Sequence, residues 1–313
     1  MTEAFRNKIL VAVDGSEQSM NAVRYVAAML PIEHTKVVLF QVYSKVPETC
    51  YDLEAFPQFC ERISVLREWE EAYTRAAEKV MDEARGILTE KGWGGETVET
   101  RLHERVAGIV RDILTESENS YSAVVVGRRG KSKLKDLVLG SVAFRLIGAV
   151  TEIPVWVVGG NPEADRILVA MDDSDRSLRS VQYLAQAVGN RPVRLTLVHV
   201  ARIMDLYQES IDRIAHPDFE HQWREASEER IFPIFDEAKK LLYDAGVSPG
   251  RVDSKVITGT LSRAGGILEE ATKGGYGTIV LGRRGLSRVR EFLLGRVSNK
   301  VLQMAHETTV WLV

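Results

Sequence analysis

The chain has 313 residues with a net charge of −3; 45% of its residues are hydrophobic and 27% are charged, which is typical of a folded globular protein of about two domains. This charge balance gives no basic field, so we expect neither nucleic acid nor an anionic membrane surface as a partner. No apolar run approaches the ~20 residues of a membrane span, the first residues do not resemble a signal peptide, and only two cysteines are present, so we expect a cytoplasmic protein.

Apolar runs alternate with amphipathic segments through the first half of the chain. Continuous runs such as residues 9–13 are typical of strands buried on both faces of a parallel sheet, whereas the alternating residues 98–102 indicate a strand nearer an edge. We predict strands at residues 9–13, 37–42, 98–102, 123–126 and 154–158. We predict helices at residues 16–30, 68–90, 106–115 and 142–149.

Residues 43–65 interrupt this pattern and are expected to form an irregular insert. The segment carries Pro47, Pro57 and both cysteines, Cys50 and Cys60. Because the second half lacks counterparts of these cysteines, free thiols are the simpler interpretation and a redox pair is the alternative. The insert could serve as a lid over a site or as a partner surface.

The second half repeats the first. The segment KILVAVD, which ends at Asp14, returns as RILVAMD ending at Asp172, and VVGRRG around Gly127 returns as VLGRRG around Gly282. We predict strands of the second half near residues 167–171, 195–200, 252–257, 278–281 and 310–313. The repeated parts are strand ends and a glycine-spaced loop, which are the places where α/β folds hold ligands.

The order of the elements predicts the fold class. Strands alternate with helices in both halves, which indicates an α/β protein of two tandem, doubly wound domains with five-stranded parallel sheets. The predicted domains are residues 1–160 and 161–313. In the second half, Pro233 should kink the long helix or split it in two.

A glycine pattern follows the fourth predicted strand of the first half. Two residues separate Gly127 from Gly130, and nine residues then lead to Gly140 and Ser141. Glycine lets the backbone turn tightly and approach a ligand, and the amides at the start of the next helix favour phosphate. Val125 stands where a Walker A motif requires glycine, so the loop is not of that type.

The pattern resembles that of the universal stress protein family. It combines Gly-x2-Gly-x9-Gly-Ser with an aspartate that ends the first strand and with a closing strand, IPVWV, at residues 153–157. Because both halves carry most of this pattern, the chain is similar to a tandem member of the family. The resemblance implies Rossmann-like domains of the adenine nucleotide alpha hydrolase-like type. It also implies a stress-response module, not an enzyme, that binds ATP with Mg²⁺ or Mn²⁺ on the phosphates and hydrolyses it slowly at most.

The resemblance also implies which residues bind the nucleotide. In the first half these are Asp14, Val42, Gly127, Arg128, Gly130, Gly140, Ser141 and Val142. In the second half they are Asp172, Val200, Gly282, Gly285, Gly295 and Ser298. The second half departs from the pattern because Arg296 replaces the serine that follows the last glycine. This arginine could pair with phosphate, or its bulk could close the pocket.

An assembly is implied as well. In the family, the closing strands of two domains commonly pair across a dimer axis. The resemblance therefore implies that residues 155–158 and 310–313 pair within this chain as a pseudo-dimer, and a homodimer of whole chains is possible.

Other interpretations stay open from the sequence. The fold could have lost nucleotide binding and act as a protein interaction module, or it could be an α/β enzyme such as a transferase or ligase, although no cluster of acid and base residues lies near Asp14. The glycines could serve turns alone, and Asp14 could be only a helix cap. His216 and His221 are a weak metal signal, and we expect no metal bound by side chains.

Overall fold

The computed structural model describes residues 7–45, 60–130, 139–160, 164–202, 219–260, 262–283 and 294–313. Insert residues 46–59, the predicted site residue Gly285 and His216 lie outside these ranges. The chain divides into two compact units, which are described separately below. Unit 1 comprises Met1–Ala27 and Ile32–Val150, and unit 2 comprises Ala28–Pro31 and Thr151–Val313.

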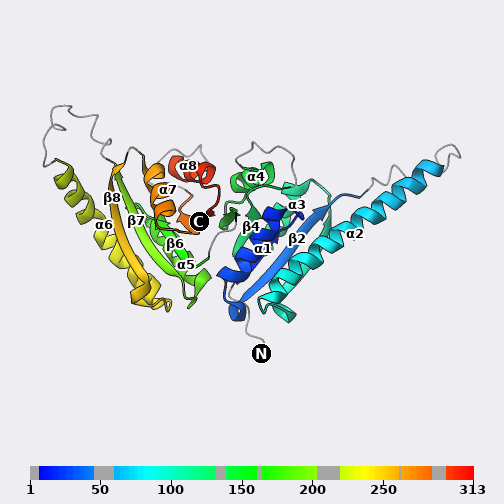
Figure 1. Ribbon diagram of the computed structural model, residues 1–313, viewed down its shortest axis with the longest axis horizontal. Coiled ribbons are helices and arrows are strands. Elements are labelled where there is room, and N and C mark those ends of the chain that lie inside the picture. Colours follow the sequence, from blue (N-terminus) through cyan, green and yellow to red (C-terminus); the bar gives the residue numbers. More distant parts are fainter. Residues whose placement is uncertain are drawn as a thin grey trace. The chain divides into compact units, whose positions relative to one another are not determined.

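Unit 1 is a parallel sheet with helices packed against it (Figure 1). Its elements are β1 (Asn7–Ala12), α1 (Glu17–Met29), β2 (Thr35–Tyr43), α2 (Cys60–Glu90), β3 (Val98–Glu104), α3 (Ile109–Ser117), β4 (Ala123–Gly127) and α4 (Ser141–Ala149). The strand order is β3-β2-β1-β4, and these strands are parallel. β1 lies inside this order with Leu10 and Val11 fully buried, as its continuous apolar run predicts, and β3 is the outer strand, as its alternation predicts.

Unit 2 has the same alternation of strands and helices. Its elements are β5 (Val155–Val158), β6 (Arg166–Ala170), α5 (Asp175–Val188), β7 (Arg194–Arg202), α6 (Phe219–Asp244), β8 (Val252–Thr260), α7 (Arg263–Lys273), β9 (Thr278–Leu281), α8 (Arg296–Met304) and β10 (Thr309–Leu312). The strand order is β5-β10-β9-β6-β7-β8. All neighbours in this order are parallel except β5, which runs antiparallel to β10.

The pairing of β5 with β10 confirms the predicted pairing of the two closing strands. Trp156 lies opposite Trp311 in the register, and Val157 lies opposite Val310. All four residues of each strand are buried. A short strand that is apolar on both faces is stable only when both faces and its edge are covered, which this pairing provides for β5.

Two helices differ from the prediction. α2 begins at Cys60, so the last part of the predicted irregular insert is helical. α6 is one continuous helix with Pro233 inside it, so the helix is not split in two, which was one of the two outcomes predicted for this proline. Proline removes one backbone hydrogen bond, but α6 buries Ile231, Phe235 and Ala238 on one face, and this burial holds both sides of the proline in one helix.

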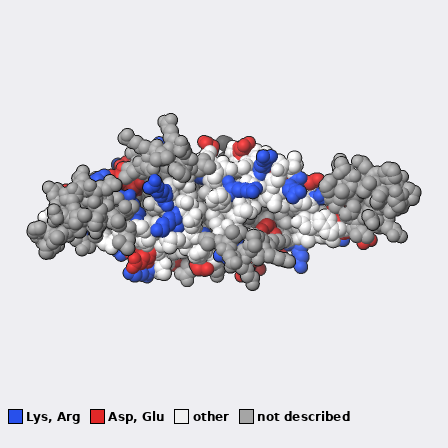
Figure 2. Space-filling view, turned by 90° about the horizontal axis from the view of Figure 1, so that it is seen from above, with Lys and Arg blue, Asp and Glu red and all other residues white. Residues whose placement is uncertain are grey.

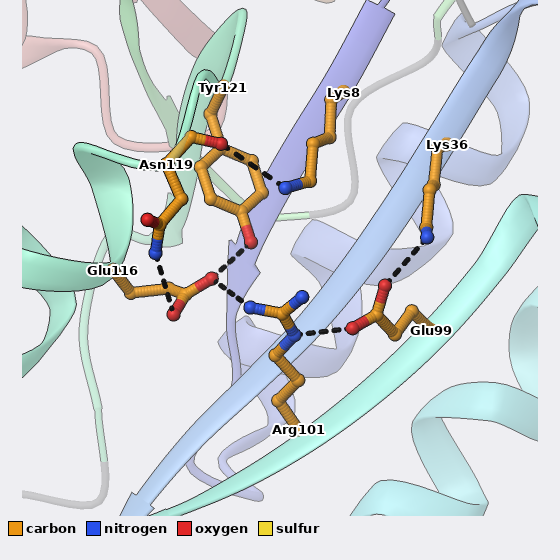
Figure 3. A network of polar contacts seen from close by, with 7 residues as sticks. All are labelled: Lys8, Lys36, Glu99, Arg101, Glu116, Asn119 and Tyr121. Carbon is orange, nitrogen blue, oxygen red and sulfur yellow. Dashed lines mark hydrogen bonds and ion pairs between the residues drawn. The ribbon is translucent and has the colours of Figure 1, made fainter. Parts of the chain in front are cut away.

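A polar network ties the outer strand β3 to α3 (Figure 3). Glu116 accepts hydrogen bonds from Arg101 Nη1 at 2.6 Å and from the buried phenol of Tyr121. Arg101 also pairs with Glu99, which pairs with Lys36 of β2 at 2.7 Å. The network fixes the side chains on this face of the sheet.

Among the described residues, no helix is long and apolar enough to cross a membrane.

Candidate functional site

Unit 1 contains a cavity of about 390 Å³ where β1, β2 and β4 end. The carboxyl ends of parallel strands are the usual ligand site of doubly wound folds, because loops and helix starts converge there. Residues from α2, α3 and α4 complete the wall. The cavity is lined by Ala12, Val13, Asp14, Ser19, Phe40, Gln41, Val42, Tyr73, Ala76, Ala77, Ile109, Ile113, Val126, Gly127, Arg129, Gly130, Gly140, Ser141, Val142 and Ala143.

The fold brings most of the predicted site residues of the first half together. The residues that line the cavity are Asp14, Val42, Gly127, Gly130, Gly140, Ser141 and Val142. Arg128 is not among them, because it points into the core and is only 1% exposed. Its neighbour Arg129 lines the cavity instead, so the two adjacent arginines face different surroundings.

Asp14 and Gly130 meet at the cavity wall. The turn after β1 holds the carboxylate, because the Ser16 amide donates to Asp14 Oδ1 at 2.9 Å. A Cβ on Gly130 would lie 2.5 Å from Asp14 Oδ2, which is closer than non-bonded atoms approach. Glycine therefore lets the backbone at residue 130 lie against this carboxylate without displacing it.

The other two glycines of the pattern bring backbone segments together. A Cβ on Gly127 would lie 2.7 Å from the carbonyl of Gln18 in the first turn of α1. The Gly140 amide donates to Arg128 O at 2.8 Å, and a Cβ on Gly140 would lie 3.2 Å from that same oxygen. The end of β4 thus packs against the backbone of α1, and the start of α4 packs against the backbone of Arg128 and Arg129.

The start of α4 presents amides to the cavity. Gly140 caps the helix without a side-chain hydrogen bond, and the three residues that follow it line the cavity wall. The first amides of a helix have no acceptor within the helix and carry the positive end of its dipole. This arrangement is suited to a phosphate or another anion.

Sequence reasoning missed Gln41, which lies near the end of β2 in the cavity wall. Its side chain is 8% exposed, and its Oε1 is buried without a hydrogen-bond partner in the described part of the chain. A buried amide oxygen without a donor costs about 1–3 kcal/mol. The signal available in the sequence was a polar residue inside an otherwise apolar strand.

An aromatic and aliphatic part of the wall was also missed. Tyr73 of α2 lines the cavity and stacks on Trp69 with ring centroids 5.1 Å apart. Phe40, Ile109 and Ile113 add apolar surface. The cavity therefore has an apolar part and a polar part, which is typical of small-molecule sites.

The corresponding residues of the second half have different contacts. Asp172 Oδ1 accepts hydrogen bonds from the hydroxyls of Ser174 and Ser177, the latter at 2.6 Å. Ser298 is buried, and its hydroxyl donates to the carbonyl of Gly282 at 2.7 Å. Val200 is also buried. In this half, the Asp172 carboxylate is engaged by neighbouring serines and the Ser298 hydroxyl by the backbone.

The glycine loop keeps part of its geometry in the second half. The Gly295 amide donates to Arg283 O at 2.7 Å, which matches the bond from Gly140 to Arg128 in unit 1. Gly295 caps α8, and Arg296 is the first residue of that helix. The start of α8 therefore has the backbone of a phosphate site but a larger side chain where unit 1 has Ser141.

Two histidines in or beside strands have structural contacts. His199 Nδ1 lies 2.9 Å from Met171 O, and burial lowers the pKa of this imidazole. His103 stacks on Phe40 with ring centroids 5.5 Å apart. Within the described ranges, no group of three or more potential metal-binding side chains comes together.

Comparison with known proteins gives consistent results. A universal stress protein of Mycolicibacterium smegmatis is 28% identical over 304 residues, which are 95% of this chain and 94% of the relative. Universal stress protein YxiE of Bacillus subtilis is 29% identical over 143 residues, which are 45% of this chain and 93% of the relative. The crystal structure of a universal stress protein from Archaeoglobus fulgidus superposes with a TM-score of 0.64 over 98% of both chains at 20% identity.

The family pattern itself occurs twice. Residues 6–159 and residues 163–313 each match the Universal stress protein family, so the two matches cover nearly the whole chain in tandem. Each match contains the features described above. These are the repeated strand ends, the glycine pattern and a unit of alternating strands and helices. The chain belongs to the universal stress protein family as a tandem, two-repeat member.

Proposed function

We propose that unit 1 is an ATP-binding regulatory module of the stress response, with Mg²⁺ or Mn²⁺ carried on the phosphates. The observation that most supports this function is the cavity at the ends of β1, β2 and β4. Seven of the eight site residues expected for the first half contribute to its wall, although they come from separate segments of the chain. A volume of about 390 Å³ lies within the usual range of small-molecule sites, roughly 300–1,000 Å³.

The parts of the cavity suit the parts of an adenine nucleotide. The apolar wall with Phe40 and Tyr73, together with the amide of Gln41, offers a place for the base. Asp14 offers a carboxylate to ribose hydroxyls. The Gly130 region and the first amides of α4 offer donors to the phosphates.

The same wall argues against fast catalysis. Among the described residues that line the cavity, Asp14 is the one carboxylate, and it already accepts the Ser16 amide. Phosphoryl transfer needs a positioned nucleophile and charge stabilisation at the terminal phosphate. We therefore propose hydrolysis that is slow at most, with the metal ion held mainly by phosphate oxygens.

We expect the first half to bind more tightly than the second. Asp172 already accepts two serine hydroxyls, and the hydroxyl of Ser298 is used by the Gly282 carbonyl. A ligand in unit 2 would have to replace these bonds, whereas Gln41 in unit 1 has an oxygen that needs a donor.

The test is to denature the freshly purified protein and to identify and count the released nucleotide by chromatography, followed by calorimetric titration with ATP and Mg²⁺. About one ATP per chain would support the first site alone, and about two would show that Arg296 is tolerated. Gly140→Val should abolish binding, because its side chain would displace the backbone of Arg128 and Arg129.

The matched control is Gly94→Val. Gly94 is extended and exposed, and a Cβ there would meet nothing within 4 Å. This variant should bind ATP as the wild type does. If the wild type neither carries nucleotide nor binds added ATP, the interaction module is the better function; if Gly140→Val binds like the wild type, the site assignment is wrong.

A further inference from the structure

A second cavity lies against the first in unit 1. It has a volume of about 410 Å³ and is bounded by the segment between β3 and α3, by the first turn of α3 and by the first turns of α4. Ile109, Ser141 and Val142 line both cavities. A ligand that reaches Ser141 from the first cavity is therefore already at the wall of the second.

The second cavity carries three arginines, Arg105, Arg111 and Arg145. All three are exposed, and none has an ion pair or side-chain hydrogen bond with any other described residue. Arg101, by contrast, is paired with Glu99 and Glu116. The three guanidinium groups of this arginine cavity are thus not neutralised by the described part of the protein.

Two acids adjoin these arginines in sequence, Glu104 and Asp112, and both are already engaged. Glu104 pairs with Lys45 Nζ at 2.7 Å. Asp112 is 5% exposed and accepts the amides of Val106 and Ala107 at 3.0 and 2.9 Å. Burial would raise the pKa of Asp112, but hydrogen bonds from the amides of Ala107, Val106 and Gly108 outweigh this and lower it. The carboxylate is ionised and turned toward the backbone, where it holds the segment that carries Arg105.

Figure 2 shows Lys and Arg side chains in blue among largely uncharged surface on the face seen from above. Guanidinium groups bind phosphate through paired N–H donors, and several of them together favour a group with more than one negative charge. A single carboxylate or a neutral ligand would not need three arginines.

We propose that the arginine cavity binds the terminal phosphates of the nucleotide, so that unit 1 distinguishes ATP from ADP and AMP. This inference rests on the proposed function, because the nucleotide enters through the first cavity. Phosphates next to the ribose would lie on the amides of α4, and those farther along the chain would pass Ser141 and reach the three arginines. The module would then respond to the proportion of ATP among the adenine nucleotides and not to their total concentration.

The test compares AMP, ADP and ATP by calorimetry in the wild type and in the triple variant Arg105→Gln, Arg111→Gln and Arg145→Gln. In the wild type, affinity should rise with each phosphate. In the triple variant, ATP affinity should fall roughly tenfold or more, while AMP affinity should change by no more than about twofold, because only terminal phosphates lose charge-assisted bonds. The dependence of ATP affinity on salt should weaken as well.

The control removes the same charge elsewhere. Lys79, Arg85 and Lys91 are exposed on or just after α2, and none of them lines either cavity. Their triple change to Gln should leave the ratio of ATP to AMP affinity unchanged. The single variant Arg145→Gln provides a smaller perturbation of the same site, and circular dichroism confirms that each variant is folded.

The outcomes separate the two claims. If the wild type binds ATP and the arginine variant keeps the wild-type ratio of ATP to AMP affinity, the arginine cavity does not hold phosphates although the proposed function stands. If the charge-matched control lowers the ratio of ATP to AMP affinity as much as the arginine variant does, the preference for ATP comes from the long-range electrostatic field and not from this cavity. If the wild type binds no adenine nucleotide at all, the proposed function fails first and this inference fails with it.

Discussion

Trp156 and Trp311 stack face to face on the paired strands β5 and β10 of unit 2, with ring centroids 3.7 Å apart and planes 4° from parallel. Both side chains are completely buried, and Tyr183 meets each of them edge-on. The stack closes an antiparallel pair that contains the last strand of each repeat. It is the largest aromatic contact described in this unit's core and should contribute strongly to its stability.

Replacing Trp156 with Ala should therefore reduce the free energy of unfolding by about 3–5 kcal/mol, the usual cost of removing a large buried aromatic side chain. The measurement is urea denaturation followed by far-UV circular dichroism. Trp69→Ala is the matched control because Trp69 is 49% exposed, and it should cost less than about 1 kcal/mol. Equal losses in the two variants would contradict the role given to the stack.

Tyr121→Phe should weaken the polar network of unit 1 without breaking it. The phenol donates to Glu116, but Arg101 and Asn119 also hold that carboxylate, so it is not left unpaired. We expect a loss of about 0.5–1.5 kcal/mol in unfolding free energy, typical of one hydrogen bond. Thermal or chemical denaturation measures it. A loss several times larger would show that Glu116 depends on Tyr121 alone.

Stability should depend on pH through His199. Burial lowers the pKa of this side chain most, and Arg263 lowers it further, against a hydrogen bond to Met171 O and the charges of Asp173 and Asp172. In the unfolded chain the imidazole takes up a proton near pH 6.5, whereas the folded protein resists protonation until the pH is lower. The stabilisation is complete above about pH 6.5 and is lost as the pH falls through the lowered pKa.

His199→Gln should remove this part of the pH dependence. Glutamine is the residue at the equivalent strand position of the first repeat, Gln41, so the fold accommodates it. The measurement is the free energy of unfolding of both proteins at several pH values between about 5 and 8. If the unfolding free energies of variant and wild type change with pH in parallel, the pH dependence comes from groups other than His199.

Gln41 should influence which base unit 1 accepts. A glutamine amide can donate to adenine N7 and accept from its N6 amino group, whereas guanine offers two acceptors at these positions. Gln41→Leu should reduce ATP affinity by roughly tenfold and leave the weaker GTP affinity nearly unchanged, since one base contact contributes about 1–3 kcal/mol of discrimination. Competition calorimetry with ATP and GTP measures the ratio. An unchanged ratio would limit Gln41 to a packing role.

Much of the fold could be predicted because its buried strands are recognisable as apolar runs in the sequence. Runs such as the one around Leu10 lack polar residues, and a repeat that recurs from Asp14 to Asp172 fixes the number of units. The start of α2 was harder, because the proline-rich segment before it obscures the first helical turns. The continuity of α6 through Pro233 depends on tertiary burial, which no local rule contains.

The site was predictable to the extent that it rests on glycine spacing. The positions of Gly127 and Gly140 at the cavity follow from close approaches to other backbone segments, and that of Gly130 from its approach to the Asp14 carboxylate. The different surroundings of Arg128 and Arg129 do not follow from sequence, because adjacent residues of a loop have no fixed alternation. The unpaired oxygen of Gln41 is likewise a property of packing alone.

The burial of β5 against β10 has a consequence for cutting the protein in two. A fragment that ended at Gly160 would keep the sequence VWVV of β5 but lose the strand that covers its edge. Such an edge recruits another strand, so we expect the fragment to associate with itself in proportion to its concentration. In the intact chain the covering strand is covalently attached, which makes its local concentration independent of how much protein is present. Fusion of the repeats thus makes the pairing insensitive to dilution.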